Sequence, residues 1–96
     1  MSRLTIKEIC VHYEVEEHFI FELEEVGLIH IIRSEEDPYI SHDELDQLER
    51  ITRLNRELKV NPPGIDVILN LLDRVEAMQK EIQDLRESLD SLEGDT

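Results

Sequence analysis

The residues with the clearest chemical potential in this chain are carboxylates gathered around an aromatic side chain. Between residues 13 and 26 the sequence contains six glutamates and no lysine or arginine. These glutamates are Glu14, Glu16, Glu17, Glu22, Glu24 and Glu25. An exposed aromatic ring within a charged rim is typical of a protein-binding surface, and here the aromatic residue is Phe21. Carboxylates in such a rim complement a basic partner.

Helical spacing decides which side of this segment faces outward. Apolar residues recur at i, i+4, i+8 and i+11, which predicts the buried face of a helix. These residues are Val15, Phe19, Leu23 and Val26. Phe21 lies nearly opposite, and its neighbours on the outer face are Glu14, Glu17, Glu24 and Glu25. We predict that these five residues bind a partner. The alternative is that Phe21 is covered by another part of the protein or by a second subunit, and that the glutamates form a solvated face.

Other candidate chemistries are weaker. A basic stripe, the cationic positions of one helix, could contact phosphate; it consists of Arg50, Arg53, Arg56 and Lys59. Asp46 and Glu49 stand four residues before Arg50 and Arg53, which favours helix-stabilising ion pairs instead. The histidines His12, His18, His30 and His42 are scattered, and neither they nor Cys10 have metal-ligand spacing. The sequence predicts no catalytic group, no cofactor site and no enzyme activity.

Length and charge limit the class of protein. The chain has 96 residues, which suits one small domain with an extension. Its net charge of -14 disfavours DNA, because nonspecific affinity comes from lysine and arginine releasing counterions. A single cysteine excludes an internal disulfide, and Cys10 is expected to be a buried core thiol. No stretch approaches the ~20 apolar residues of a membrane helix, and the first residues do not resemble a signal peptide. We therefore expect a cytoplasmic protein.

The glutamate-rich segment is expected to be the second helix of a helix-turn-helix. Thr5 and Glu8 form a capping box that begins a helix ending near Tyr13. Residues 13–17 supply the turn, and the second helix runs to Val26. Gly27 then fits the left-handed position that ends a helix. In DNA-binding proteins with this motif the second helix enters the major groove, where this one would bring glutamates to phosphates.

A small hairpin and a third helix are expected to follow. The apolar run 28–32 and the short run 39–40 predict two strands joined by the polar turn 34–38, which together form the wing of a winged helix. Ser41 and Glu44 predict a second capping box at the start of the third helix. The apolar positions of that helix are Leu45, Leu48, Ile51, Leu54 and Leu58.

A long helix is expected to complete the chain. Pro62 and Pro63 fit its first turn, and residues 65–72 form a broad apolar stripe suited to packing on a globular domain. Beyond this stripe the pattern narrows to a heptad seam, defined as Val75, Met78, Ile82, Leu85, Leu89 and Leu92. Such a seam predicts a coiled coil, and a homodimer would bury it. We therefore predict a mainly α protein with a winged helix-turn-helix domain over residues 1–60 and a dimerisation helix over 61–96.

Three short motifs resemble the winged-helix domain of the MerR family: Leu4–Ile9, Glu24–Ile29 and Tyr39–Ser41. The family pairs this domain with an antiparallel dimerisation helix, which Ile65–Leu92 would form here. Typical members carry a basic-aromatic segment in the second helix. This chain has His18–Phe21 at that place, surrounded by acidic residues.

The chain is more similar to a branch of that family, the CbpM-like chaperone modulators, over about Leu4–Leu92. The most specific part is Pro63–Ile65, followed by Leu71–Asp73 and a run rich in Glu, Gln and Leu. This resemblance implies that the protein binds the J-domain of a CbpA/DnaJ-like co-chaperone and inhibits its action on Hsp70. The alternatives are a MerR-type DNA-binding transcriptional regulator and an adaptor for another basic partner.

Overall fold

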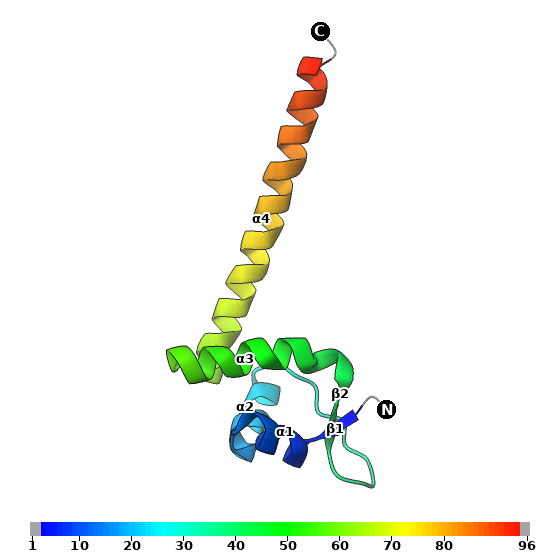
Figure 1. Ribbon diagram of the computed structural model, residues 1–96, viewed down its shortest axis with the longest axis vertical. Coiled ribbons are helices and arrows are strands. Elements are labelled where there is room, and N and C mark those ends of the chain that lie inside the picture. Colours follow the sequence, from blue (N-terminus) through cyan, green and yellow to red (C-terminus); the bar gives the residue numbers. More distant parts are fainter. Residues whose placement is uncertain (1–2, 95–96) are drawn as a thin grey trace. The chain divides into compact units, whose positions relative to one another are not determined.

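The computed structural model describes residues 3–94, which are mainly helical with one small antiparallel sheet (Figure 1). The chain divides into two compact units, of which the first ends at Asp66 and the second begins at Val67. The elements are β1 (Arg3–Thr5), α1 (Ile6–Tyr13), α2 (Glu17–Glu25), β2 (Tyr39–Ser41), the short 3-10 helix η1 (His42–Glu44), α3 (Leu45–Leu58) and α4 (Pro62–Gly94). This content is consistent with the mainly α winged helix expected from the sequence.

Helix α1 begins at the predicted capping box. The Thr5 hydroxyl accepts a hydrogen bond from the Glu8 N–H at 3.2 Å, and a Glu8 carboxylate oxygen accepts one from the Thr5 N–H at 3.2 Å. The helix buries Ile6 and Ile9. Cys10 is half-buried, so the expectation of a fully buried thiol was wrong in degree. Burial, and then the charge of Glu17, raise the pKa of this thiol.

Helix α2 follows a short turn, as predicted, and Gly27 has the left-handed conformation expected after it, with φ of 84°. Phe19 and Leu23 are buried as the spacing predicted, whereas Val15 and Val26 are half-buried. Ile20 was missed and is fully buried. A helix packed on two sides buries a wider stripe than one apolar row indicates.

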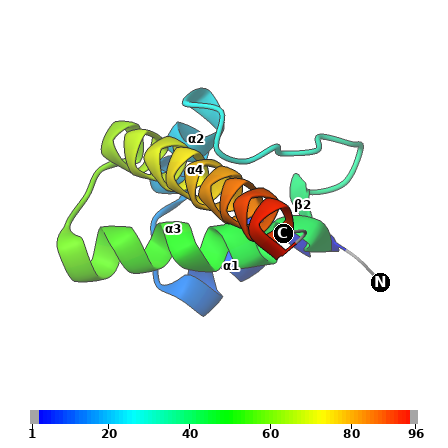
Figure 2. The ribbon, with the colours of Figure 1, turned by 90° about the horizontal axis from the view of Figure 1, so that it is seen from above.

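The sheet differs from the predicted hairpin. Strand β2 pairs antiparallel with β1, in the register Arg3↔Ser41, Leu4↔Ile40 and Thr5↔Tyr39. The apolar run 28–32 contributes one isolated bridge, Ile32↔Tyr39, so the prediction of a strand there was wrong in extent. Figure 2 shows the connection between α2 and β2 running without regular structure before it returns to β2.

Side-chain hydrogen bonding explains why this run does not form a full strand. The His30 N–H donates to the carboxylate of Glu44 at 2.9 Å, so a backbone donor of the run is satisfied by a side chain instead of a neighbouring strand. Glu44 therefore does not complete the predicted capping box. The Ser41 hydroxyl alone caps η1, accepting from the Asp43 N–H at 3.4 Å.

Helix α3 supplies the centre of the first unit's core. Leu48 and Ile51 are fully buried, and the hydroxyl of buried Thr52 donates to the Leu48 carbonyl at 2.9 Å. Leu58, the last apolar position of this helix, is 65% exposed and lies outside the core. The helix ends directly after it, where Lys59 adopts a left-handed conformation.

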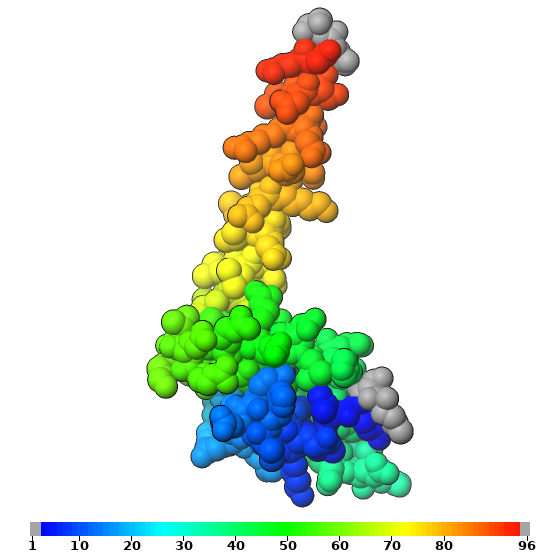
Figure 3. All heavy atoms as spheres, in the orientation of Figure 1, coloured from blue at the N-terminus to red at the C-terminus, as the bar shows by residue number. Residues whose placement is uncertain are grey.

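Helix α4 begins at Pro62, as the two prolines predicted. Ile65, in the first unit, is fully buried, and Leu69 is buried too. From Leu71 to Gly94 every residue of the helix is exposed. These residues form the yellow-to-red part of the space-filling view in Figure 3. None of the helices described is long and apolar enough to cross a membrane.

Replacing Gly27 should destabilise the fold through backbone conformation alone. A Cβ built on Gly27 has nothing within 4 Å, so steric contact is not the reason. The positive φ costs an L-residue about 1–2 kcal/mol. Gly27→Ala should therefore lower the free energy of unfolding by about that amount, measured by urea denaturation. Gly27→Asn should lose less, because asparagine tolerates this region better. Equal stability of all three proteins would contradict the argument.

Candidate functional site

The outer face of α2 carries the predicted aromatic residue among acidic ones. Phe21 is 37% exposed, whereas Phe19 and Leu23 of the same helix are buried. Glu17 and Glu25 are exposed. The prediction that Phe21, Glu17 and Glu25 lie on the exposed side of α2 is therefore confirmed. That they bind a partner stays a prediction.

Phe21 lies at a shallow hollow of about 200 Å³ that the sequence analysis did not foresee. Its lining comes from three parts of the chain: Ile6 and Lys7 of α1, Glu17 and Phe21 of α2, and Asp37 and Pro38 before β2. The ring thus has a lysine near it as well as carboxylates. No local pattern could indicate this, because α1 and residues 37–38 are distant in sequence from α2.

Glu14 is placed differently from the prediction. It caps the C-terminus of α1 in a left-handed conformation, with φ of 55°, and therefore precedes α2 instead of lying on it. Helical spacing counted from α2 does not apply to Glu14, so its assignment to the outer face of that helix was wrong. Its side chain is exposed and lies beside a different hollow, together with Tyr13 and Arg56.

Glu24 is not a free carboxylate. Its two oxygens accept hydrogen bonds from the two terminal nitrogens of Arg33, at 2.7 and 2.8 Å. This bidentate geometry is the strong form of an arginine–carboxylate pair. The hydrogen bond from Arg33 is the largest cause that lowers the pKa of Glu24, and burial opposes it. The pair joins α2 to the segment before β2 and neutralises the arginine near the acidic turn 34–38.

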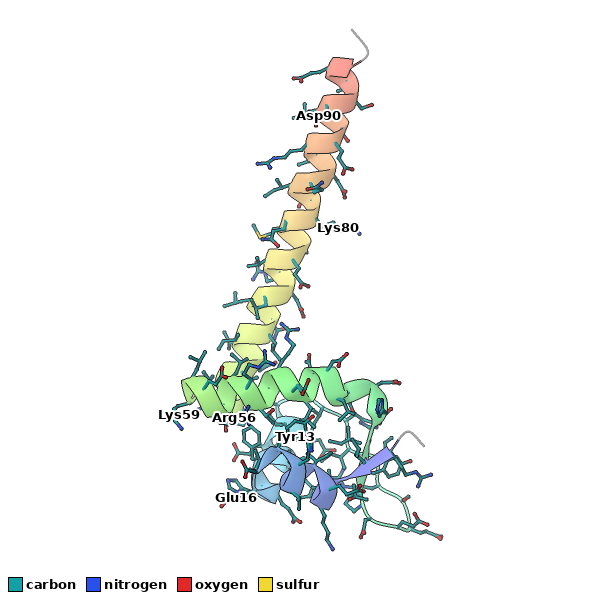
Figure 4. The ribbon with its side chains drawn as sticks, in the orientation of Figure 1. Tyr13, Glu16, Arg56, Lys59, Lys80 and Asp90 are labelled. Atoms are coloured by element: carbon teal, nitrogen blue, oxygen red, sulfur yellow. The ribbon has the colours of Figure 1, made fainter. Side chains whose placement is uncertain are left out.

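The basic stripe of α3 lacks the ion pairs expected from its spacing. Within residues 3–94, no ion pair joins Asp46 to Arg50 or Glu49 to Arg53. The interpretation of these residues as helix-stabilising pairs was therefore wrong. Figure 4 shows Arg56 and Lys59 toward the C-terminal end of α3.

The predicted dimerisation seam is apolar and uncovered in the single chain. Its exposed fractions range from 47% at Val75 to 68% at Leu92. Fully burying a side chain of this kind is worth ~1.5–3 kcal/mol, so six of them in one row favour a partner helix. Association itself is not a property of the single chain, and dimerisation stays a prediction.

The titratable groups of the described residues do not assemble into a metal centre. In residues 3–94, no group of three or more His, Cys, Asp or Glu side chains is placed to hold a metal ion. The two ring nitrogens of His18 lie 3.0 Å from a carboxylate oxygen of Glu16 and 3.9 Å from one of Glu22. These two glutamates therefore contact a histidine at the protein surface. The site is therefore described best as a surface with one aromatic residue and several carboxylates.

Comparison with known proteins identifies the family. A family model described as "MerR HTH family regulatory protein" matches residues 4–87. The chain belongs to the MerR helix-turn-helix family. Within it the chain is similar to proteins named "Chaperone modulatory protein CbpM" from Escherichia coli O1:K1 / APEC and from Escherichia coli strain UTI89 / UPEC. Each is 30% identical over 86 residues, covering 88% of this chain and 85% of the relative.

The MerR-family match covers α1, α2, β2, α3, most of β1 and most of α4. It agrees with the resemblance that the sequence motifs carried. These two relatives are named as chaperone modulatory proteins and not as enzymes.

The Glu24–Arg33 pair predicts a measurable pH dependence. Because the folded-state pKa of Glu24 lies below its ordinary value of 4.5, the pair stabilises the fold above that value. Its contribution is lost as the pH falls through the folded-state pKa. Arg33→Ala should raise the pKa of Glu24 toward the ordinary value, measured by carbon-detected NMR of the side-chain carboxyl.

Arg50→Ala is the matched control, since Arg50 has no ion pair within the described residues. It should leave the titration of Glu24 unchanged. An identical Glu24 titration in the wild type and in Arg33→Ala would show that the pair does not form in solution.

Proposed function

We propose that this protein is a chaperone modulator that binds the J-domain of a CbpA/DnaJ-like co-chaperone and restrains its action on Hsp70. The observation that carries the proposal is the acidic outer face of α2, with Phe21 exposed in a helix whose other aromatic residue is buried. The names of the CbpM relatives support a role in modulating a chaperone.

Charge complementarity supports a J-domain as partner. The second helix of a J-domain is basic, and the chain offers a net charge of -14, with exposed Glu17 at the hollow of Phe21 and exposed Glu25 one helical turn further along α2. Opposite charges steer encounter and raise the association rate, while a desolvated aromatic anchor supplies much of the affinity. The action would be steric and competitive, because a J-domain surface covered by this protein is unavailable to Hsp70.

The internal pairing of Glu24 changes the expected contact set. Glu24 is paired with Arg33 and contributes little free charge. The acidic rim on α2 therefore consists of Glu17 and Glu25. Asp37, beside Phe21, adds an acidic group from outside the helix. Glu14 lies apart from this set. The surface proposed for the partner is therefore Phe21 with Glu17, Glu25 and Asp37.

We also propose that the protein is a homodimer joined along α4 as an antiparallel coiled coil. The seam Val75 to Leu92 supports this, because its apolar side chains are exposed in the single chain. The heptad spacing would align them against the same row of a second copy. An antiparallel arrangement follows the resemblance to the MerR family.

Removing the aromatic ring should weaken binding strongly. Phe21→Ala should reduce affinity for the J-domain by ~2 kcal/mol, which is about thirtyfold. The measurement is titration calorimetry of the full chain against the J-domain at physiological salt. Val11→Ala is the matched control, because Val11 is 81% exposed on α1 and belongs to no proposed contact. It should bind as the wild type does.

This titration has three possible outcomes, which test the proposed function and the proposed binding surface separately. Tight binding lost in Phe21→Ala would support both function and surface. Tight binding kept in Phe21→Ala, with folding intact, would support the function and move the surface elsewhere. No binding by the wild type would overturn the proposed function and favour an adaptor role with another basic partner.

Charge inside the seam should separate the dimer. Ile82→Lys places a cation near the centre of the seam, where burial of an unpaired charge is strongly unfavourable. We expect a monomer by analytical ultracentrifugation at micromolar concentration, where the wild type sediments as a dimer. Gln83→Lys is the control, since it adds the same charge outside the seam. A wild-type monomer at these concentrations would contradict the dimer.

A DNA-binding regulator is the second candidate. The family description, and the α3 cations that form no ion pair within the described residues, favour it. Against it stand the acidic α2 and the neutralised Arg33, since about 6–10 phosphate contacts are typical of such proteins. Retention on heparin at low salt tests this candidate, and failure to bind would exclude it.

A further inference from the structure

Another hollow lies on the first unit, separate from the one at Phe21. Its volume is about 350 Å³. It is lined by Leu4, Glu8, Ile9, His12 and Tyr13 from β1 and α1, and by Leu45 at the start of α3. It shares no lining residue with the hollow at Phe21. Leu4, Leu45 and the ring of Tyr13, each half-buried, give it apolar walls, and Ile9 beneath them is buried in the core.

An adjoining hollow of about 530 Å³ continues it along α3. His12, Tyr13 and Leu45 line both hollows, so the two form one groove between α1 and α3, which we call the α1–α3 groove. Figures 1 and 2 both show α1 beside α3, and Figure 4 shows Tyr13 lying between them. The continuation adds Asp43, Asp46 and Glu49, together with His42.

The rim of the groove is acidic. Among the described residues that line it there are four carboxylates and neither a lysine nor an arginine. The side-chain carboxylates of Asp46 and Glu49 accept no hydrogen bond and form no ion pair within residues 3–94. Burial and the charges of Glu49 and Asp46 raise the pKa of Tyr13, which agrees with carboxylates standing near its ring. The cations Arg56 and Lys59 line the hollow beside Glu14, which shares only Tyr13 with the groove, and within residues 3–94 they form no ion pair with these carboxylates.

The elements that line the groove favour a helix over an extended peptide as its ligand. The long walls of the groove are α1 and α3, whose backbone donors and acceptors are used internally, and the three-residue strand β1 contributes only Leu4. An extended peptide would therefore find no long row of hydrogen bonds there. A helix with apolar anchors at i and i+3 or i+4 fits such a groove through side chains alone. Basic residues beside those anchors would meet the acidic rim.

We propose that the α1–α3 groove is a docking site for a basic amphipathic helix of a protein partner. The apolar anchors of this helix would contact Leu4, Tyr13 and Leu45, and its lysines or arginines would lie against Asp43, Asp46 and Glu49. The site is distinct from the surface at Phe21 and does not depend on a J-domain being the partner.

The probe is a synthetic peptide with a leucine row at i, i+3, i+4 and i+7 and lysines beside it. A peptide of the same composition in scrambled order is its control. Titration calorimetry with the full-length wild type should give binding to the patterned peptide that is at least tenfold tighter than to the scrambled one. Equal affinity for both, or no binding, would overturn the proposal.

Leu45→Glu tests whether the peptide binds in the groove or is held only by its charge. This change makes the protein more acidic, so charge alone predicts equal or tighter binding of the cationic peptide. Docking in the groove predicts a loss of at least tenfold, because an anchor would meet a carboxylate. Leu58→Glu makes the same change at an exposed position of α3 outside the groove, and it should not weaken binding. A loss shared equally by both variants would contradict the site.

Leu45 is half-buried, so a second test uses two double variants at exposed positions instead. Asp46→Lys with Glu49→Lys reverses two exposed charges at the rim and should reduce affinity at least tenfold. Asp84→Lys with Glu87→Lys makes the same change in charge on exposed residues of α4. A similar loss in both double variants would show that net charge, and not the groove, attracts the peptide. Binding of the J-domain, measured in parallel, reports on the proposed function separately.

Discussion

The structure of the first unit depends on one apolar core to which nearly every element contributes. Its fully buried large side chains are Ile9, Ile20, Leu23, Ile40, Leu48, Ile51 and Ile65. They come from α1, α2, β2, α3 and the first turn of α4. Burying each is worth ~1.5–3 kcal/mol, a large share of the stability of so small a unit. Because this core holds α1, α2 and α3 against one another, it also determines which faces of these helices remain exposed.

The acidic residues occupy the surface that the core leaves, yet they do not all act alike. Glu24 and Glu44 are used internally, one by the guanidinium of Arg33 and the other by the N–H of His30. Glu17, Glu25 and Asp46 remain exposed. A surface of this kind attracts cations over a distance but needs an apolar anchor for affinity. The chain offers such anchors at Phe21 and along the α1–α3 groove.

The second unit poses a different physical problem. A helix packed on one side hides its apolar row, whereas the row from Val75 to Leu92 is exposed in the single chain. A short isolated helix gains little from propensity, so most helical stability in proteins comes from packing of the apolar face. A second copy of α4 would provide that packing. Dimerisation would also double the number of partner-binding surfaces in one particle, which raises the effective affinity for a partner presenting several sites.

Local patterns in the sequence determined where α1 and α4 begin and where α2 ends, because a capping box, paired prolines and a left-handed glycine each act within a few residues. Helical periodicity likewise placed Phe21 on the outside and Phe19 and Leu23 inside. Tertiary structure decided what such patterns do not encode. It paired β2 with β1, exposed Leu58, and buried Ile20. It also formed the ion pair between Glu24 and Arg33, which are nine residues apart in the sequence. These outcomes depend on which backbone and side-chain groups meet across the fold, and spacing along one helix carries no information about that.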